Sequence, residues 1–282
     1  MKFDTEHMPD EQTFMKYLTV SFDQSQDDVW NNIAPEIEEP VVRRISWQRI
    51  TLTMAACILL LIACGVGLRS FTRTTTTQVG LHKIVGLPDG SQVILNADSR
   101  LEFKPFWWWM ERRAYLEGEG YFEVAEGKKF TISTRQGEVS VLGTSFDVKS
   151  RTNEFQVYCT SGKVEVKGTA QPESFILTPG MKLRLEPEFE QSNVEEEVSV
   201  IAWKDDIFFF ASTPLYKVAE EFELQYGGKV SIEDQQLRAY RFQAKFQAPA
   251  SLRQALHVLE LTFDIEVEEK GDNHYNLLRK KP

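Results

Sequence analysis

The sequence has 282 residues, enough for one large domain or for two to three small ones. Aromatic residues make up 12% of it, which favours folded material. A net charge of −10 without a wide Lys/Arg cluster argues against direct binding to nucleic acid. Cys57, Cys64 and Cys159 do not form the pattern of a disulfide framework, and we expect all three to be unpaired.

Residues 1–48 form an acidic head in which ten Asp and Glu accompany four Lys and Arg. Asp10 can cap a first short helix, and Ser25 with Asp28 resembles the capping box of a second, which Pro35 bends or ends. The alternatives are a solvated, partly ordered tail and a segment that folds against a basic partner. For the second, the expected contact residues repeat at helical spacing: Phe14, Leu18, Phe22, Trp30 and Ile33.

The segment Ile50–Leu68 has 19 residues without a formal charge and predicts one membrane-spanning helix. At ~1.5 Å per residue it spans roughly 28 Å, close to the ~30 Å hydrocarbon core of a bilayer. Three arginines precede it and two follow it, a weak bias toward a cytoplasmic N-terminus. Leu61–Cys64 resembles a lipobox, which leaves open an alternative in which Cys64 is a lipidated N-terminus.

The rest of the chain predicts two folded domains after a polar linker at residues 70–80. Short alternating apolar runs from Leu81 to Leu185, broken by turn residues, indicate an all-β domain over residues 81–194, with a solenoid, sandwich or barrel all open. Residues 195–282 have the order β-α-β-β-α-β-β of a small α/β domain. The expected fold class is therefore multidomain: a helical head (1–48), a transmembrane helix (49–69), an all-β domain and an α/β domain.

Enzyme chemistry finds little support in the sequence. Four scattered histidines lack metal-ligand spacing, so no metal and no cofactor is expected. Glu117, Glu119 and Glu123 alternate as the solvated face of a strand would, and this reading is preferred over paired catalytic carboxylates. The adjacent tryptophans Trp107–Trp109 are expected in the core and at a protein interface, with at least one exposed and sugar stacking as an alternative.

Several stretches of the chain carry a family pattern. They are LPDGSQVILNADSRLEF (Leu87–Phe103), RRAYLEGEGYFEV (Arg112–Val124), VLGTSFDV (Val141–Val148), SGKVEV (Ser161–Val166) and LTPG (Leu177–Gly180). In this order, after one apolar helix, they resemble the FecR-type anti-sigma factors. The family often has Asn where this chain has Asp147, Ala where it has Gly120, and Pro-Phe where it has Lys129-Phe130. Residues Trp203–Leu278 resemble the secretin/TonB short N-terminal module.

The resemblance implies a single-pass protein of the bacterial inner membrane, with a cytoplasmic N-terminus and periplasmic C-terminal domains. The head would hold an extracytoplasmic-function sigma factor, and the signalling domain of a TonB-dependent outer-membrane receptor would contact the periplasmic part. Tyr240–Phe246 alternates as an edge strand for that contact would, with Tyr240, Phe242 and Phe246 as candidate residues, although an inner strand explains the pattern as well. The alternative function is a membrane-tethered periplasmic glycan- or cell-wall-binding module that uses the tryptophans.

Some members of this family cleave themselves at a Gly-Thr bond, which here would be Gly143–Thr144. The Thr144 hydroxyl would attack the Gly143 carbonyl, the acyl group would shift from nitrogen to oxygen, and water would hydrolyse the ester. Glycine suits the upstream position because it leaves the carbonyl sterically open. The alternative is an intact chain in which Gly143 occupies a turn and Thr144 caps a strand.

Overall fold

The structure is a computed structural model that describes residues 25–33, 47–152, 154–169, 173–185, 189–193 and 198–280. Only the backbone is described at Asn32, Ile33, Arg49, Val198 and Ser199. The chain divides into two units, Met1–Leu59 and Leu60–Pro282. The first predicted helix of the head, with Phe14, Leu18 and Phe22, lies outside the described residues.

The second predicted helix of the head is present as α2 (Gln26–Ile33). Its first turn is capped as the sequence predicts, because the backbone N–H of Asp28 donates to the Ser25 hydroxyl at 3.3 Å. Trp30 lies on this helix with 63% of its surface exposed. A large aromatic side chain in water is available for a partner.

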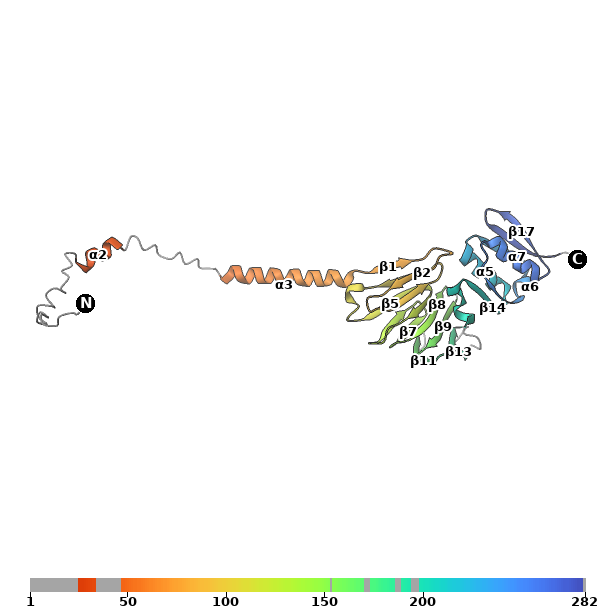
Figure 1. The fold of residues 1–282 in the computed structure, drawn as a ribbon, viewed down its shortest axis with the longest axis horizontal. Coiled ribbons are helices and arrows are strands. Elements are labelled where there is room, and N and C mark those ends of the chain that lie inside the picture. The colour runs from red at the N-terminus through yellow and green to blue at the C-terminus, as the bar shows by residue number, and fades with distance from the viewer. Residues whose placement is uncertain are drawn as a thin grey trace, which may run out of the picture. The chain divides into compact units, whose positions relative to one another are not determined.

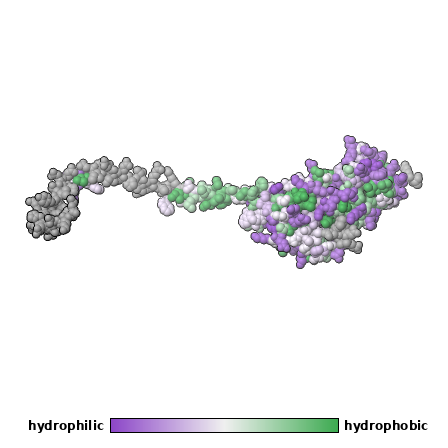
Figure 2. Space-filling view, viewed as in Figure 1, coloured by the Kyte–Doolittle hydropathy of each residue, from purple (hydrophilic) through white to green (hydrophobic). Residues whose placement is uncertain are grey.

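Helix α3 (Trp47–Ser70) contains the predicted span. Residues Ile50–Ser70 form one apolar helix near the N-terminus that is a candidate single membrane span, with none of its most apolar stretch buried in protein. Figure 2 shows the hydrophobic colour along this helix. The hydroxyls of Thr51 and Thr53 donate to the carbonyls of Gln48 and Ile50 at 3.0 and 2.9 Å, so neither lacks a partner in an apolar surrounding.

A 13-stranded sheet curled into a half-barrel follows α3 (Figure 1). The prediction of β structure is confirmed, and the shape is a curled sheet in place of a solenoid or a plain sandwich. The strands are β1 (Arg73–Thr76), β2 (Lys83–Gly86), β3 (Gln92–Leu95), β4 (Arg100–Phe103), β5 (Arg112–Glu123), β6 (Phe130–Ser133), β7 (Gly137–Val141), β8 (Ser145–Arg151), β9 (Glu154–Ser161), β10 (Val164–Gly168), β11 (Ser174–Leu177), β12 (Met181–Leu185) and β13 (Phe189–Asn193).

The long strand β5 makes the curl. Its first half pairs with β4 and β6, and its second half pairs with β3 and β8. Gly118 lies between the halves with φ +95°, and Ser99 packs against the place where a Cβ would be. Only glycine fits this bend without strain. The curl closes around one core that includes Phe122, Phe130 and Phe146.

The linker expected at residues 70–80 contains a strand. Residues Arg73–Thr76 form β1, which pairs with β4 from Arg73 opposite Phe103 to Thr76 opposite Arg100. The physical reason is the run of threonines, since β-branched residues favour extended backbone and Thr75 is buried in the sheet. Only Phe71 and Thr72 therefore connect α3 to the sheet.

A second core lies beyond the curled sheet. The short helix α4 (Val198–Ile201) and a 3₁₀ turn (Ala202–Asp205) lead into it. Its elements are β14 (Ile207–Pro214), α5 (Leu215–Tyr226), β15 (Lys229–Ile232), α6 (Gln235–Arg238), β16 (Arg241–Gln247), α7 (Leu252–Thr262), β17 (Ile265–Gly271) and β18 (His274–Arg279). β14 pairs with β16, and β18 lies between β15 and β17. Except for the short α6, every element of this part follows the order that the sequence predicts.

Candidate functional site

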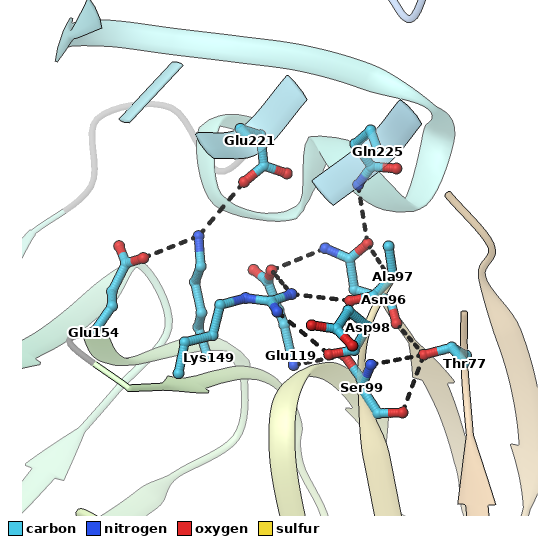
Figure 3. A network of polar contacts seen from close by, with 11 residues as sticks. Thr77, Asn96, Ala97, Asp98, Ser99, Glu119, Lys149, Glu154, Glu221 and Gln225 are labelled. Atoms are coloured by element: carbon cyan, nitrogen blue, oxygen red, sulfur yellow. Dashed lines mark hydrogen bonds and ion pairs between the residues drawn. The ribbon is translucent and has the colours of Figure 1, made fainter. Parts of the chain in front are cut away.

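The two cores meet at a set of polar side chains, which we call the joint (Figure 3). The curled sheet contributes residues from β5, β8 and the turn after β3, and the C-terminal part contributes residues from the 3₁₀ turn and from α5. The joint consists of Asn96, Glu119, Asp147, Lys149, Arg151, Trp203, Glu221 and Gln225.

One chain of hydrogen bonds crosses the joint through Asn96. The Gln225 side chain on α5 donates to Asn96 Oδ1 at 3.1 Å, and Asn96 Nδ2 donates to Glu119 Oε2 at 2.8 Å (Figure 3). Beside it, the backbone N–H of Gly80 donates to the Leu224 carbonyl at 3.0 Å. That carbonyl belongs to the last turn of α5, where carbonyl groups lack partners within the helix. The curled sheet thus binds this end of α5 through both side chains and backbone.

A second connection is an ion cluster around Lys149. Its Nζ lies 3.2 Å from Glu154 Oε2 on β9 and 3.7 Å from Glu221 Oε2 on α5. Burial lowers the pKa of Lys149, but the negative charges of Glu119, Glu221 and Glu154 outweigh it and raise the pKa above the ordinary value. Lys149 therefore remains a cation, and its position depends on carboxylates from both sides of the joint.

Two carboxyl groups of the joint are deeply buried. Burial raises the pKa of Glu119, opposed by the positive charges of Lys149 and Arg151 and by the hydrogen bond from Asn96. Burial also raises the pKa of Asp147 well above its ordinary value, and the nearby Glu119 raises it further. Within the described part of the chain, neither oxygen of Asp147 has a hydrogen bond of regular geometry. Burial and the neighbouring Glu119 thus both disfavour a negative charge at Asp147, a position where the family often has the uncharged Asn.

The segment before β14 is held against the sheet by aromatic and charged contacts. The ring of His82 packs edge-on against Trp203 at 5.4 Å, and His82 Nδ1 lies 3.6 Å from Asp206 Oδ1. Lys204 Nζ lies 3.7 Å from the centre of the Tyr121 ring. The polar indole N–H of Trp203 lowers the pKa of Asp147 and so opposes the effect of burial on that carboxyl group. These contacts fix the start of the C-terminal part on the outer face of the sheet.

A cleft of about 560 Å³ opens between the two parts and is lined from both sides. Lys149, Arg184 and Glu154 line it from the curled sheet, and Phe209 and Lys217 line it from the C-terminal part. In the described part of the chain, no group of three or more His, Cys, Asp or Glu could hold a metal ion. What this arrangement supplies chemically is paired charge and hydrogen bonding, which hold two cores in one orientation.

The predicted receptor-binding residues share one strand but differ in exposure. β16 pairs with β14 along one edge, and no other described strand pairs with it. Tyr240, just before the strand, is exposed, Phe246 is half-buried, and Phe242 is fully buried in the C-terminal core. The backbone of β16 and the ring of Tyr240 are thus available for contact, whereas Phe242 serves the core.

The Gly143–Thr144 bond lies in the turn between β7 and β8. Thr144 is buried, and its hydroxyl donates to the Lys163 carbonyl at 3.2 Å. Gly143 is not among the residues with positive φ. Self-cleavage stays a prediction, which a denaturing gel of the purified chain beside Thr144→Ala tests: two fragments meeting at residue 144 in the wild type alone would support it.

The sequence reasoning missed most of the joint. The expectation that Glu119 faces solvent is wrong: Glu119 is buried at the joint, where it accepts a hydrogen bond from Asn96, which accepts one from Gln225 on α5. Glu221 and Gln225 carry no local signal, since their partners are far away in the chain. One signal was available: Asp147, Lys149 and Arg151 place three charges at alternate positions of one strand, on one face.

The tryptophan segment folds as the 3₁₀ helix Pro105–Trp107 followed by a turn, and it divides between core and surface. Trp108 is buried, with its ring edge-on to Phe103 at 5.5 Å and to Phe130 at 5.7 Å. Trp109 is 69% exposed. The expectation that at least one tryptophan is exposed is therefore confirmed.

Comparison with known proteins gives a consistent result. The family model described as FecR protein matches residues 73–165, and the model described as FecR, C-terminal matches residues 207–275. Two crystal structures of a candidate anti-sigma factor from Parabacteroides distasonis ATCC 8503, at 1.65 and 2.50 Å resolution, are similar to this chain. Each is 25% identical with a TM-score of 0.68, and the matches cover 74% and 75% of this chain and 100% of the other. No curated protein matches.

The first match begins at β1 and the second begins at β14, so the two models fall on the curled sheet and on the C-terminal core in the family's order. The similar crystal structures contain both parts, and their description agrees with the resemblance of the sequence motifs. The chain therefore belongs to the family of FecR-type anti-sigma factors.

Proposed function

We propose that this anti-sigma factor holds an extracytoplasmic-function sigma factor at the cytoplasmic face of the inner membrane and relays to it a signal from an outer-membrane TonB-dependent receptor. The observation that carries the proposal is the order of parts along the chain. A helix with an exposed tryptophan comes first, then one apolar helix long enough to span a bilayer, then the FecR and FecR C-terminal regions. This order suits a protein that binds different partners on the two sides of a membrane.

Sigma-factor binding is assigned to the head. Trp30 on α2 is the described candidate, and Phe14, Leu18, Phe22 and Ile33 are the other residues proposed from the sequence. Acidic residues such as Asp27 and Asp28 beside Trp30 would speed association with a basic surface and make it sensitive to salt. The apolar side chains would supply most of the affinity, because buried aromatic residues dominate interfaces.

The test is binding of the full chain, in lipid nanodiscs, to a purified sigma subunit by calorimetry. Trp30→Ala is expected to weaken binding by about 2 kcal/mol if the ring is a buried anchor. Asn31→Ala is the matched control, because Asn31 is exposed on the same helix and points to a different side. Equal affinity of wild type and Trp30→Ala would reject the role of Trp30, and no binding by the wild type would reject sigma capture itself.

Orientation follows from the same proposal. Residues 1–48 are placed in the cytoplasm and residue 282 in the periplasm. Phosphatase fusions at residue 282 should be active, and fusions within the head should be inactive. An exported N-terminus in that assay would exclude the proposed relay, because the head could not reach a sigma factor.

Receptor contact is assigned to the unpaired edge of β16. An extended segment of a receptor's signalling domain could add there as a further strand, with main-chain hydrogen bonds for affinity and Tyr240 at its side. Gln243→Pro should abolish signalling while the domain stays folded, since proline removes a main-chain donor. Gln243→Ala is the control and should signal normally. Loss of the fold in the proline variant would favour a purely structural role for the strand.

The joint supports a relay because α5 of the C-terminal core contacts the curled sheet through three residues: Glu221, Gln225 and Leu224. A receptor domain that pulled on β16 would transmit force to α5 and so to these contacts. The alternative glycan-binding function predicts instead that the chain sediments with cell-wall material and binds no sigma subunit. Co-purification with a sigma subunit distinguishes the anti-sigma function from the glycan-binding function.

A further inference from the structure

The connection between α3 and the curled sheet leaves little freedom. α3 ends at Ser70 and β1 begins at Arg73, so only Phe71 and Thr72 lie between them. Two extended residues reach about 7 Å. The apolar span Ile50–Ser70 has 21 residues, about 31 Å of helix, which fills the hydrocarbon core. One end of the sheet must therefore lie at the depth of the lipid headgroups.

Strand register identifies which loops share that end. Arg73 at the start of β1 lies opposite Phe103 at the end of β4, and Phe103 lies opposite Ala114 near the start of β5. Phe130 at the start of β6 lies opposite both Arg112 and Val141. The segment Lys104–Glu111, the turn before Phe130 and the turn after Val141 therefore lie at the end of the sheet nearest to α3.

This end carries exposed apolar side chains, which we call the apolar end. They are Phe71, Phe106, Trp109, Met110 and Leu142. Two ring contacts place the segment directly against the end of α3: Phe71 and Phe106 have their centres 5.4 Å apart, and the Arg69 guanidinium lies 5.1 Å from the centre of the Trp107 ring. Large apolar side chains exposed together at one end of a domain mark a surface that contacts another protein or a membrane.

The charges around the apolar end favour an anionic lipid surface. Arg69, Arg73, Lys104 and Lys128 are exposed there, accompanied by Glu111 and Glu126. Aromatic rings with flanking basic residues are what membrane-water interfaces select, because the rings enter the headgroup layer and the cations meet lipid phosphates.

We propose that the apolar end rests on the bilayer, with Phe106, Trp109 and Met110 inserted among the lipid headgroups beside α3. The occupant of this surface is the membrane in which α3 is anchored, so the proposal rests on α3 spanning a membrane, as in the proposed function. It does not depend on a sigma factor, on a receptor or on the direction of the span.

The segment is built rigidly enough to present these side chains. The buried Arg112 donates from Nε to Asp89 Oδ2 at 2.6 Å, from Nη1 to the Lys128 carbonyl at 2.6 Å and from Nη2 to the Ala125 carbonyl at 2.8 Å. One guanidinium thus ties the loops of this end together. Trp108 anchors the segment Lys104–Glu111 because its ring packs in the core of the curled sheet. The exposed rings are therefore held outward by packed neighbours.

The test measures the depth of a nitroxide label on the full chain in vesicles of phosphatidylethanolamine and phosphatidylglycerol. The label is placed at Met110→Cys, with Cys57→Ala and Cys64→Ala in the background and the buried Cys159 kept. Leu261→Cys is the matched control, because Leu261 is an exposed leucine (75%) on α7 of the C-terminal core. We expect the label at 110 to meet oxygen often and an aqueous nickel chelate rarely, and the label at 261 to do the reverse.

The apolar contact is tested by adding Trp109→Ser to the chain labelled at 110. The label should then shift toward the water-exposed value found at 261. Vesicles of phosphatidylcholine alone should give a smaller shift in the same direction, because the cations lose their anionic partners. Met110→Cys and Trp109→Ser both change exposed residues, and thermal unfolding in detergent checks that each variant stays folded.

Different outcomes overturn different statements. If the chain is extracted from vesicles by alkaline carbonate, α3 does not span, and the proposed function falls together with this inference. If the chain resists extraction but the label at 110 collides with nickel as the label at 261 does, only the inference is overturned. Sedimentation of the full chain with peptidoglycan, lost on Trp109→Ser, would also overturn it by assigning the same rings to a glycan.

Discussion

At the apolar end of the curled sheet, large apolar side chains are exposed, whereas at the joint ionisable side chains are buried. Phe106 and Trp109 lie outside beside α3, while Glu119, Asp147 and Lys149 lie inside beside the C-terminal core. Each set inverts the usual rule that apolar groups are buried and charges exposed. Both regions are therefore surfaces that contact something outside the curled sheet: a bilayer at the apolar end and the second core at the joint.

The largest effect should come from breaking the ion cluster of the joint. Lys149→Met removes the cation that lies between Glu154 and Glu221, and it leaves Arg151 as the remaining cation beside Glu119. We expect a loss of unfolding free energy of about 3–5 kcal/mol, because a buried charge without its partner is costly. Chemical denaturation of the full chain in detergent, followed by tryptophan fluorescence, measures it.

The control for this variant is Lys270→Met. Lys270 Nζ lies 2.8 Å from Glu268 Oε1, but both side chains are exposed, so the pair should contribute about 0–1 kcal/mol. Equal losses for the two variants would mean that the joint behaves as an ordinary protein surface.

A smaller effect, opposite in sign, is expected from Asp147→Asn. Since the pKa of Asp147 is raised in the folded state, the folded chain keeps a proton that the unfolded chain releases, so stability falls as the pH rises from about 4 toward the folded pKa. Asparagine removes this loss, about 1.4 kcal/mol for each unit of raised pKa. Melting temperatures between pH 4 and 8 should diverge in favour of the variant as the pH rises.

Asp272→Asn serves as the matched change, since Asp272 is exposed in the turn before β18. Its melting temperature should follow the wild type at every pH. A pH-independent difference between Asp147→Asn and the wild type would contradict a raised pKa at Asp147.

The smallest effect on stability is expected at the apolar end. Trp109→Ser should change the unfolding free energy in detergent by no more than about 0.5 kcal/mol, because an exposed ring has little to lose. Trp108→Ser, one residue earlier, should cost about 3–5 kcal/mol, since that ring packs on Phe103 and Phe130. A large loss for Trp109→Ser would mean that its ring supports the fold, and the comparison between the two regions would then lose its basis.

Much of the fold could be predicted from the sequence because its signals are local. The alternation of Lys229–Ile232 gives β15 with its observed bounds, and the uncharged run from Ile50 gives the candidate span. β1 was missed because a run of threonines without apolar alternation also suits a linker, and only pairing with β4 decides for a strand. Local pattern cannot report a partner strand that lies 24 residues further on.

The joint was harder to predict for a related reason. A carboxylate at an alternating position of a strand, such as Glu119 in β5, is usually solvated, and its burial here depends on a helix about a hundred residues later in the chain. The bend at Gly118 could be suspected from the sequence, but its direction could not. The residues of the head illustrate the opposite case, since Trp30 was recognised from helical spacing alone and does lie exposed on α2.

The short passage from α3 into β1 also bears on how fast such a regulator can be destroyed. A protease acting beside the membrane needs a stretch of chain that it can draw out into an extended form, and Phe71–Thr72 is too short to supply one. The next residues are paired, with Thr74 opposite Glu102 and Thr75 opposite Leu101. Among the described strands β1 pairs with β4 alone, so its detachment would break the pairing with a single strand. The rate of cleavage would then depend on how often the four residues of β1 separate from β4, so the stability of this pairing would set the lifetime of the protein.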